Sequence, residues 1–446
     1  MQQSIYRQFW RYAIPTIAAM LVNGLYQVVD GIFIGQYMGS EGLAGINVVW
    51  PVISVILGIG MMIGVGTGAL SSIKQGEGNL EAAKKTLATG LMLLLALGPI
   101  VALALWGFSD NALQLQGAQG RMLELATQYL DVLIVGSVFA LGSIAVPFLL
   151  RNDDSPNAAT LLMVIGAVIN IVLDYVFIVL FAWELAGAAL ATAIAQAVVT
   201  ILGVAYFFSK QAKMRLTFSD FRFQFDVVPP ILSIGLASFF MFAYGSFMIA
   251  LHNKLFADYG SVVLVGAYAI LGYIVSFYYL VVEGIANAMQ PLLSYNFGAG
   301  RKDNMRKLFK VAMISAVAGG AVFVGLLNVY PVDVVSIFNS TDTMLIDNTV
   351  TGIRLHLFSM FLDGFLVVAA AYYQSINMSK KALFVTLGNM LVQLPFLYVL
   401  PKIWGVTGIW IAYPISNIAL TIVVVYMMWK DVRLLKEDSG VPAVAV

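Results

Sequence analysis

The chain has 446 residues, of which 61% are hydrophobic and 11% are charged, and its mean hydropathy is +0.90. A soluble protein carries roughly 45–50% apolar and about 25% charged residues, so this composition excludes a soluble globular chain, and the long unbroken apolar runs exclude a membrane β-barrel. The net charge of +1 argues against a nucleic-acid partner, and the absence of cysteine removes disulfides and thiolate sites. The sequence therefore predicts an all-α polytopic membrane protein.

Apolar runs of about 20 residues, the length that crosses a bilayer, occur twelve times along the chain. The first run is too long for a cleavable signal peptide and contains an aspartate, Asp30. We therefore expect twelve transmembrane helices, near residues 10–36, 43–72, 86–108, 124–150, 156–182, 185–209, 227–253, 261–294, 308–330, 350–375, 382–400 and 405–429.

The two halves of the chain repeat. Residues 76–85 (GEGNLEAAKK) follow the second span, and residues 298–307 (GAGRKDNMRK) follow the eighth. Six spans plus six in the same orientation indicate parallel repeats, that is, two pseudo-symmetric six-helix lobes. We expect an N-terminal lobe at 1–209, a cytoplasmic linker at 210–226, a C-terminal lobe at 227–430 and a cytoplasmic tail at 431–446.

Lysine and arginine predict the orientation of the spans. Both termini and the loops after even-numbered spans hold 20 of the 24 basic residues, and the other loops hold only Arg121, Lys254, Arg354 and Lys402. Cytoplasmic loops carry such an excess. The sequence thus predicts that both termini are cytoplasmic and that the protein lies in a bacterial-type cytoplasmic (inner) membrane.

Acidic residues inside the spans are candidates for function, because an ionisable side chain at the bilayer centre costs about 2.5–3.5 kcal/mol on insertion scales. Asp30, Asp174, Glu283 and Asp363 lie well inside apolar runs, and no Lys or Arg lies at the centre of any run. The membrane interior is therefore acidic, which favours protons, metal cations or cationic substrates.

Two of these acids are expected at one depth. At a rise of ~1.5 Å per residue, Asp30 in the first span and Asp174 in the fifth both fall in the outer half of the bilayer. Asn170 lies one turn before Asp174 on the same face, and Thr192 in the sixth span reaches the same level. These oxygens could bind Na⁺ or share a proton; the alternative is a polar network that only ties helices together.

Three further residues have open interpretations. Pro15 either kinks the first span or occupies its first turn, where proline is harmless. Asp363 is a possible second cation site or substrate counter-charge, against a structural hydrogen-bonding role. Glu283, near the cytoplasmic end of the eighth span, is interpreted first as a gate or packing contact, with a second cation or substrate site as the alternative.

The chain resembles the MATE family, the multidrug and toxic compound extrusion transporters. The resemblance rests on residues 26–35 (YQVVDGIFIG), on the 76–85 loop, and on the order of Pro15, Asp30, Asn170, Asp174 and Thr192. It implies export of cationic or amphiphilic drugs by alternating access, coupled to inward flow of H⁺ or Na⁺, with no cofactor and no catalytic residue.

The resemblance favours the DinF-type branch over the NorM-type branch. In DinF-type members the first-lobe cluster carries the coupling, at the positions of Asp30, Asn170 and Asp174 here. NorM-type members also use acids on spans 7 and 10; this chain has Asp363 on span 10, but His252 and no acid in the apolar part of span 7.

Two alternatives remain beside a drug exporter. A lipid-linked oligosaccharide flippase of the same superfamily would need Arg or Lys in its cavity, and an intramembrane enzyme would need a metal motif or a serine elbow. Neither pattern is found within the spans. We expect a transporter and not an enzyme, a monomer, small-molecule drugs and membrane lipid as its partners, and H⁺ ahead of Na⁺ as the coupling ion.

Overall fold

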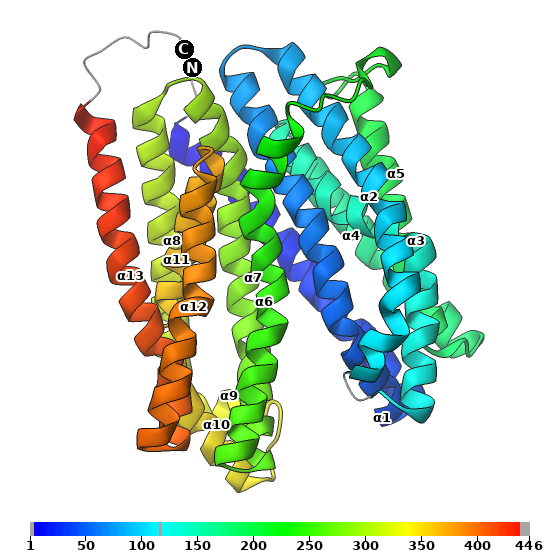
Figure 1. Ribbon diagram of the computed structural model, residues 1–446, viewed down its shortest axis with the longest axis vertical. Helices are drawn as coiled ribbons and strands as arrows, with labels where there is room; N and C mark the ends of the chain where they lie inside the picture. Colours follow the sequence, from blue (N-terminus) through cyan, green and yellow to red (C-terminus); the bar gives the residue numbers. More distant parts are fainter. Residues whose placement is uncertain (1–3, 116–117, 438–446) are drawn as a thin grey trace. The chain divides into compact units, whose positions relative to one another are not determined.

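The computed structural model describes residues 4–115 and 118–437, and the regular elements among them are all helical (Figure 1). The last part of the predicted tail, 438–446, lies outside the described residues. The first half of the chain forms α1 (Ile5–Gly76), α2 (Leu80–Leu115), α3 (Gly120–Asn152), α4 (Pro156–Asp174), the π-helix η1 (Tyr175–Leu180) and α5 (Glu184–Phe208). After the 3₁₀-helix η2 (Phe218–Asp220) come α6 (Val228–Tyr259), α7 (Val262–Gly298), α8 (Lys302–Val329), α9 (Pro331–Ser336), α10 (Thr343–His356), α11 (Met360–Ser375), α12 (Ser379–Trp404) and α13 (Val406–Glu437).

Two breaks explain how these helices make twelve spans. Gly39, with a φ of 65°, divides α1 into two membrane-length helices. α10 and α11 are bent by 52° and qualify as one span only together, whereas eleven other helices are long and apolar enough alone. The all-α fold is therefore confirmed for the described part of the chain, with eleven membrane-length helices, or twelve spans when the bent pair of α10 and α11 counts as one. The continuous tenth span expected at 350–375 is in fact broken.

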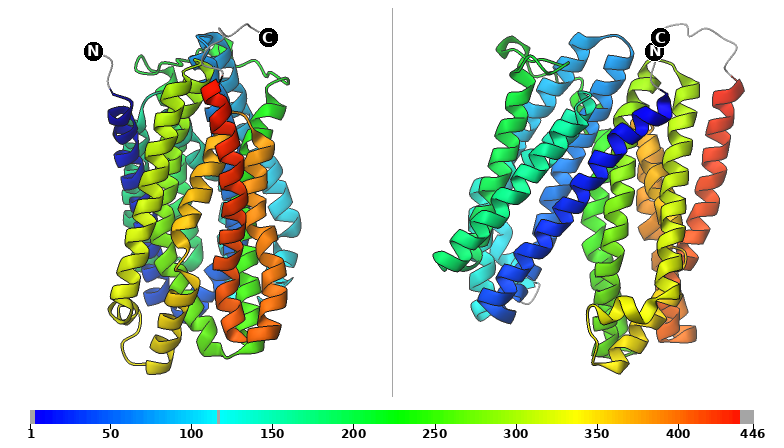
Figure 2. Two further views of the ribbon diagram at one scale, coloured as in Figure 1. Left: turned by 90° about the vertical axis from the view of Figure 1, so that its left-hand side faces the viewer. Right: turned by 180° about the vertical axis from the view of Figure 1, so that it is seen from behind.

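The chain folds into two compact units. In the first, Arg11–Ala243, α3 packs against α2 and α5, and α4 packs against α5. In the second, which runs from Tyr244 onward and includes the start of α1 up to Trp10, α11 packs against α7 and α8, and α12 against α13. Within the second unit, short α9 lies at the end opposite the α7–α8 turn (Figure 2). The chain thus changes units inside two helices, at Arg11 in α1 and at Tyr244 in α6.

The turns of the two halves correspond. Gly78 follows α1 with a φ of 80°, and Gly300, 222 residues later, follows α7 with a φ of 67°. Asp154 after α3 and Asn377 after α11 also share the left-handed conformation, with φ values of 64° and 58°. Glycine adopts this conformation without steric cost, and Asp and Asn adopt it more readily than other residues. The repeat read in the sequence is therefore repeated in the backbone.

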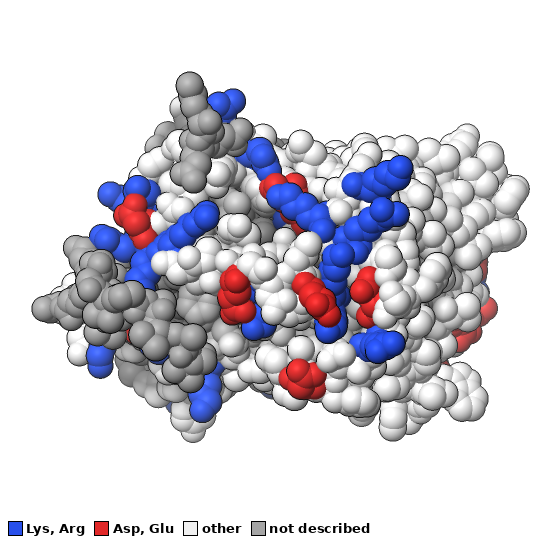
Figure 3. Space-filling model, turned by 90° about the horizontal axis from the view of Figure 1, so that it is seen from above, with Lys and Arg blue, Asp and Glu red and all other residues white. Residues whose placement is uncertain are grey.

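The segment between α5 and α6 packs onto the first unit. Met214 and Leu216 are fully buried, and the Leu216 amide donates to the Phe207 carbonyl over 2.8 Å. Alternate residues of this segment, including Lys213 and Arg215, point outward. Lys and Arg side chains gather on this end of the molecule (Figure 3).

Many large apolar side chains face outward along the helices. On α2, Leu103 and Trp106 are 68% and 77% exposed. Such exposure would be costly in water, but it is the normal surface of a helix that faces lipid. The protein is therefore a multi-pass membrane protein.

Candidate cation-coupling site

Two carboxylates from different helices meet within the first unit. Asp30 lies on the first half of α1, and Asp174 is the last residue of α4 and is fully buried. The two carboxyl groups are close enough to hydrogen-bond to one another when one of them carries a proton. A six-residue π-helix, η1, begins directly after Asp174. π-Helical turns are rare and occur frequently at functional sites.

The other two predicted residues join this cluster through α5. The Asn170 side-chain amide, on α4, donates to the Thr192 hydroxyl over 3.1 Å. Asn170 is 1% exposed and lies one helical turn before Asp174. The structure thus brings together all four residues that the sequence placed at one depth.

The cluster is rich in acceptors that lack donors. Asp30 Oδ1, both carboxyl oxygens of Asp174, and Asn170 Oδ1 are buried, and none of them has a hydrogen-bond partner among the described residues. A buried acceptor without a donor costs about 1–3 kcal/mol. An arrangement of several such oxygens suits a group that brings positive charge, either a proton shared by the carboxylates or a cation bound among them.

Two tyrosines that sequence reasoning missed also belong to the cluster. Tyr129, from α3, lies next to Thr192, and Tyr26 lies near both Asp30 and Asp174. Tyr26 could have been found, because it lies one turn before Asp30 on the same helix face. Nothing local in the sequence distinguishes Tyr129 from the other tyrosines of the apolar runs.

Pro15 lies inside α1, which begins at Ile5, so it is not a first-turn proline. Its ring removes an amide donor that would bond to the carbonyl of Arg11, four residues earlier. The Pro15 carbonyl accepts a hydrogen bond from the Thr160 hydroxyl of α4 over 2.8 Å. The helix therefore has a weakened point next to a contact with α4.

Asp363 lies in the second unit in a different environment. It falls in the first turn of α11, just after the bend, where the helix dipole favours a carboxylate. Tyr279 on α7 donates to its Oδ2 over 2.6 Å, and Asn417 on α13 donates to its Oδ1 over 2.8 Å. Both oxygens of Asp363 are therefore paired, unlike those of Asp174.

The structure does not join Glu283 to these hydrogen bonds; it is half-buried on α7, one turn after Tyr279. His252, noted in place of an acid on the seventh span, is buried on α6. Its Nδ1 donates to the Met248 carbonyl over 2.8 Å, and its Nε2 contacts the Gln393 side-chain amide at 3.3 Å. These contacts are typical of a histidine that holds helices together.

Comparisons with known proteins agree along most of the chain. A family model described as MatE matches residues 15–176 and 234–399. The multidrug export protein MepA of Staphylococcus aureus (strain NCTC 8325 / PS 47) is 25% identical over 91% of this chain and 89% of its own length. The protein of the same name from Staphylococcus saprophyticus is also 25% identical, over 92% of this chain and 90% of its own.

Solved structures share the fold. A MATE crystallised in a bent conformation is 25% identical, with a TM-score of 0.91 and 98% of both chains covered. A MOP superfamily transporter from Pyrococcus furiosus, described as having a binding pocket of reverse polarity, is 24% identical, with a TM-score of 0.91 over 98% of this chain and 97% of that one.

Proposed function

Because this chain belongs to the MATE family, whose model matches residues 15–176 and 234–399, we propose that it is a secondary active multidrug exporter. It moves cationic and amphiphilic compounds out of the cell by alternating access, and inward flow of a cation drives the cycle. Two relatives that cover about nine tenths of the chain are named multidrug export proteins, which supports drug-like substrates. Membership of this family excludes the intramembrane-enzyme alternative.

The facing pair of Asp30 and Asp174 is the observation that carries the proposal. When both groups are ionised they repel, and their buried oxygens have no donor among the described residues. One proton removes the repulsion and supplies a hydrogen bond between the carboxyl groups. Na⁺ would find suitable hard oxygen ligands in Asp30, Asn170, Asp174 and Thr192, so both ions fit the donor set. We take H⁺ as the coupling ion ahead of Na⁺.

Ion binding then moves α1. Once the repulsion between Asp30 and Asp174 is gone, the part of α1 around Asp30 approaches α4 and α5. The helix then bends at Pro15, where a hydrogen bond is missing. A change of about 1–3 kcal/mol in one contact shifts a two-state equilibrium 5- to 150-fold, which is enough for a switch. We expect a straighter α1 with the pair ionised and a more bent α1 with it protonated. Solved MATE structures are described as bent and as straight.

The acids elsewhere have supporting roles in this proposal. Asp363, held by Tyr279 and Asn417, provides negative charge for a second cation or a cationic substrate, and Glu283 acts as a gate or a substrate contact. An acidic interior without a central base favours cations over anions. This distinguishes an exporter of cationic drugs from the flippase alternative, which must hold a pyrophosphate.

We further propose that the protein works as a monomer in the cytoplasmic membrane with both termini inside. The bias of basic residues supports this orientation. The DinF-type branch is favoured over the NorM-type branch because, among the residues that the structure describes, facing carboxylates with unpaired oxygens occur in the first-unit cluster.

Drug resistance in bacterial cells that lack their own exporters tests the proposal. Asp30→Asn and Asp174→Asn should each abolish resistance while the amount of protein in the membrane stays unchanged, because the amide cannot exchange the coupling proton. Asp131→Asn is the matched control, since Asp131 is an exposed acid on α3 of the same unit. Resistance at the wild-type level in either cluster variant would refute the assignment.

A further inference from the structure

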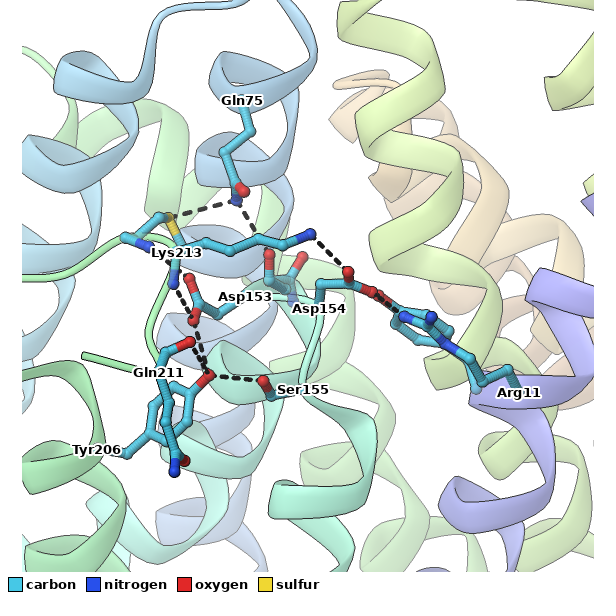
Figure 4. A network of polar contacts seen from close by, with 11 residues as sticks. Arg11, Gln75, Asp153, Asp154, Ser155, Tyr206, Gln211 and Lys213 are labelled. Carbon is cyan, nitrogen blue, oxygen red and sulfur yellow. Dashed lines mark hydrogen bonds and ion pairs between the residues drawn. The ribbon is translucent and has the colours of Figure 1, made fainter. Parts of the chain in front are cut away.

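Two adjacent aspartates occupy the turn between α3 and α4, away from the coupling cluster (Figure 4). Asp153 follows the last residue of α3, and Asp154 is the next residue. Together they contact α1, α5 and the segment between α5 and α6, so that one short turn joins three other parts of the first unit.

Asp154 holds α1 on one side and the inter-helix segment on the other. Its Oδ1 accepts from the Arg11 guanidinium and from the Tyr12 hydroxyl, and its Oδ2 pairs with the Lys213 ammonium at 2.5 Å (Figure 4). We call these four residues the Asp154 clamp. Arg11 and Lys213 are 202 positions apart in the chain, and one carboxylate binds both.

Asp153 also binds the segment between α5 and α6, around Lys213. It is 1% exposed and accepts from the backbone amides of Lys213 and Met214, over 2.9 and 2.6 Å, and from the Tyr206 hydroxyl over 3.0 Å. Hydrogen bonds of Asp153 therefore join the turn to the segment around Lys213, and Asp154 attaches α1 to both.

Asp154 shares its backbone conformation with an asparagine at the matching turn of the second unit. Its φ of 64° lies in the left-handed region, where glycine or asparagine is the usual residue after a helix. Asn377 occupies the corresponding turn of the second unit with a φ of 58°. Aspartate and asparagine both adopt this conformation more readily than other residues, so the difference between the two turns is the charge.

The clamp holds α1 at its weakened point. Arg11 is the residue whose carbonyl loses its helical donor to Pro15, four positions later. The Thr160 hydroxyl holds the Pro15 carbonyl from α4, so both edges of the weak point are attached to the α3–α4 region. Arg11 is also where α1 passes from one unit to the other.

We propose that Asp154 is a positioning residue for ion-coupled export: it holds the N-terminal end of α1 in place, so that movement at Asp30 bends the helix at Pro15. Without the clamp, α1 would tilt as a whole, and the movement would be lost before it reached the rest of the molecule. This inference rests on the proposed function. The Arg11–Asp154 pair is partly solvated, with side-chain exposures of 45% for Arg11 and 35% for Asp154.

Asp154→Asn tests the proposal, because Asn377 shows that asparagine fits this turn. We expect an unchanged affinity of the purified protein for a cationic dye and at least a fivefold lower efflux rate at saturating dye. Glu77→Gln is the matched control: it removes an ion pair of similar exposure, Lys74–Glu77, that joins neighbouring residues instead of separate helices. Arg11→Gln breaks the same attachment without altering the turn, and it should reproduce the loss.

Spin-label distances separate pinning from a merely structural role. One label pair replaces Ile14 and Leu161, beside the clamp, and another replaces Val28 and Val172, near the carboxylates; all four side chains are exposed. On acidification the distance between the labels at 28 and 172 should change in wild type, while the distance between the labels at 14 and 161 stays fixed. In Asp154→Asn the distance between the labels at 14 and 161 should change as well. If the distance between the labels at 14 and 161 stays fixed and efflux stays at the wild-type level in both Asp154→Asn and Arg11→Gln, the inference is overturned. If wild-type efflux needs no ion gradient, the proposed function fails, and the distance between the labels at 14 and 161 still decides whether Asp154 holds α1 in place.

Discussion

Alanine in place of Asp363 and of Asp174 should have opposite effects on stability and transport. Asp363→Ala leaves two buried donors, the Tyr279 hydroxyl and the Asn417 amide, without their acceptor. Each unsatisfied buried donor costs about 1–3 kcal/mol. Tyr279 retains a weak contact with the Tyr413 hydroxyl at 3.3 Å, so we expect a loss of about 2 kcal/mol in the free energy of unfolding. Asp174→Ala removes buried oxygens that accept no hydrogen bond. Their cost of about 1–3 kcal/mol disappears with them and offsets the packing that is lost with the side chain, so the free energy of unfolding should change by no more than about 1 kcal/mol.

Reversible unfolding of the purified protein in mixed micelles, followed by tryptophan fluorescence, measures both changes. Dye efflux from cells measures transport by the same variants. We expect Asp363→Ala to be destabilised with residual efflux, and Asp174→Ala to be as stable as wild type but inactive. Equal destabilisation by both substitutions would show that Asp174 is a structural residue, and the contrast drawn between the two acids would be wrong.

Three further predictions follow from the charges and from the weakened helix. Monovalent lipophilic cationic dyes should be exported faster than anionic dyes of equal size, and equal rates in an efflux assay would favour the flippase alternative. Pro15→Ala should fold and bind dye but export it poorly, with a smaller pH-induced change in the α1–α4 distance; normal efflux would leave Pro15 without a role in coupling. Although burial acts to raise it, hydrogen bonds from Lys213 and Tyr12 and nearby positive charge lower the pKa of Asp154. An acid with a lowered pKa stabilises the fold at any pH above its ordinary pKa, near 3.8. This stabilisation is lost only as the pH falls through the lowered pKa. The distance beside the clamp should therefore stay constant from pH 7.5 to 5, and a change within that range would show that another group controls it.

Long-range features of this molecule were predictable where each depends on a simple count. The twelve spans follow from apolar length, and the meeting of Asp30, Asn170, Asp174 and Thr192 follows from equal depth and a constant rise per residue. The bend before Asp363 was not predictable, because the apolar run through it is continuous.

Contacts across helices were much less accessible from sequence. The position of Pro15 inside α1 depended on where the helix begins, which apolar length does not determine to within a turn. Tyr129 reaches the cluster only because α3 packs against α5. The Asp154 clamp joins residues from three distant segments, and in sequence it was visible only as an acidic pair in a loop. Helix packing, not local pattern, sets these contacts.

Transport by purified protein in vesicles tests the central claim most directly, because Asp30 and Asp174 are proposed to bind the coupling cation. A cationic dye is supplied outside vesicles that hold the protein, with a pH gradient and a Na⁺ gradient imposed separately, for wild type, Asp174→Asn and Asp131→Asn. The account predicts dye movement driven by the pH gradient in wild type and Asp131→Asn and none in Asp174→Asn. Gradient-driven movement in Asp174→Asn at the wild-type rate would contradict it.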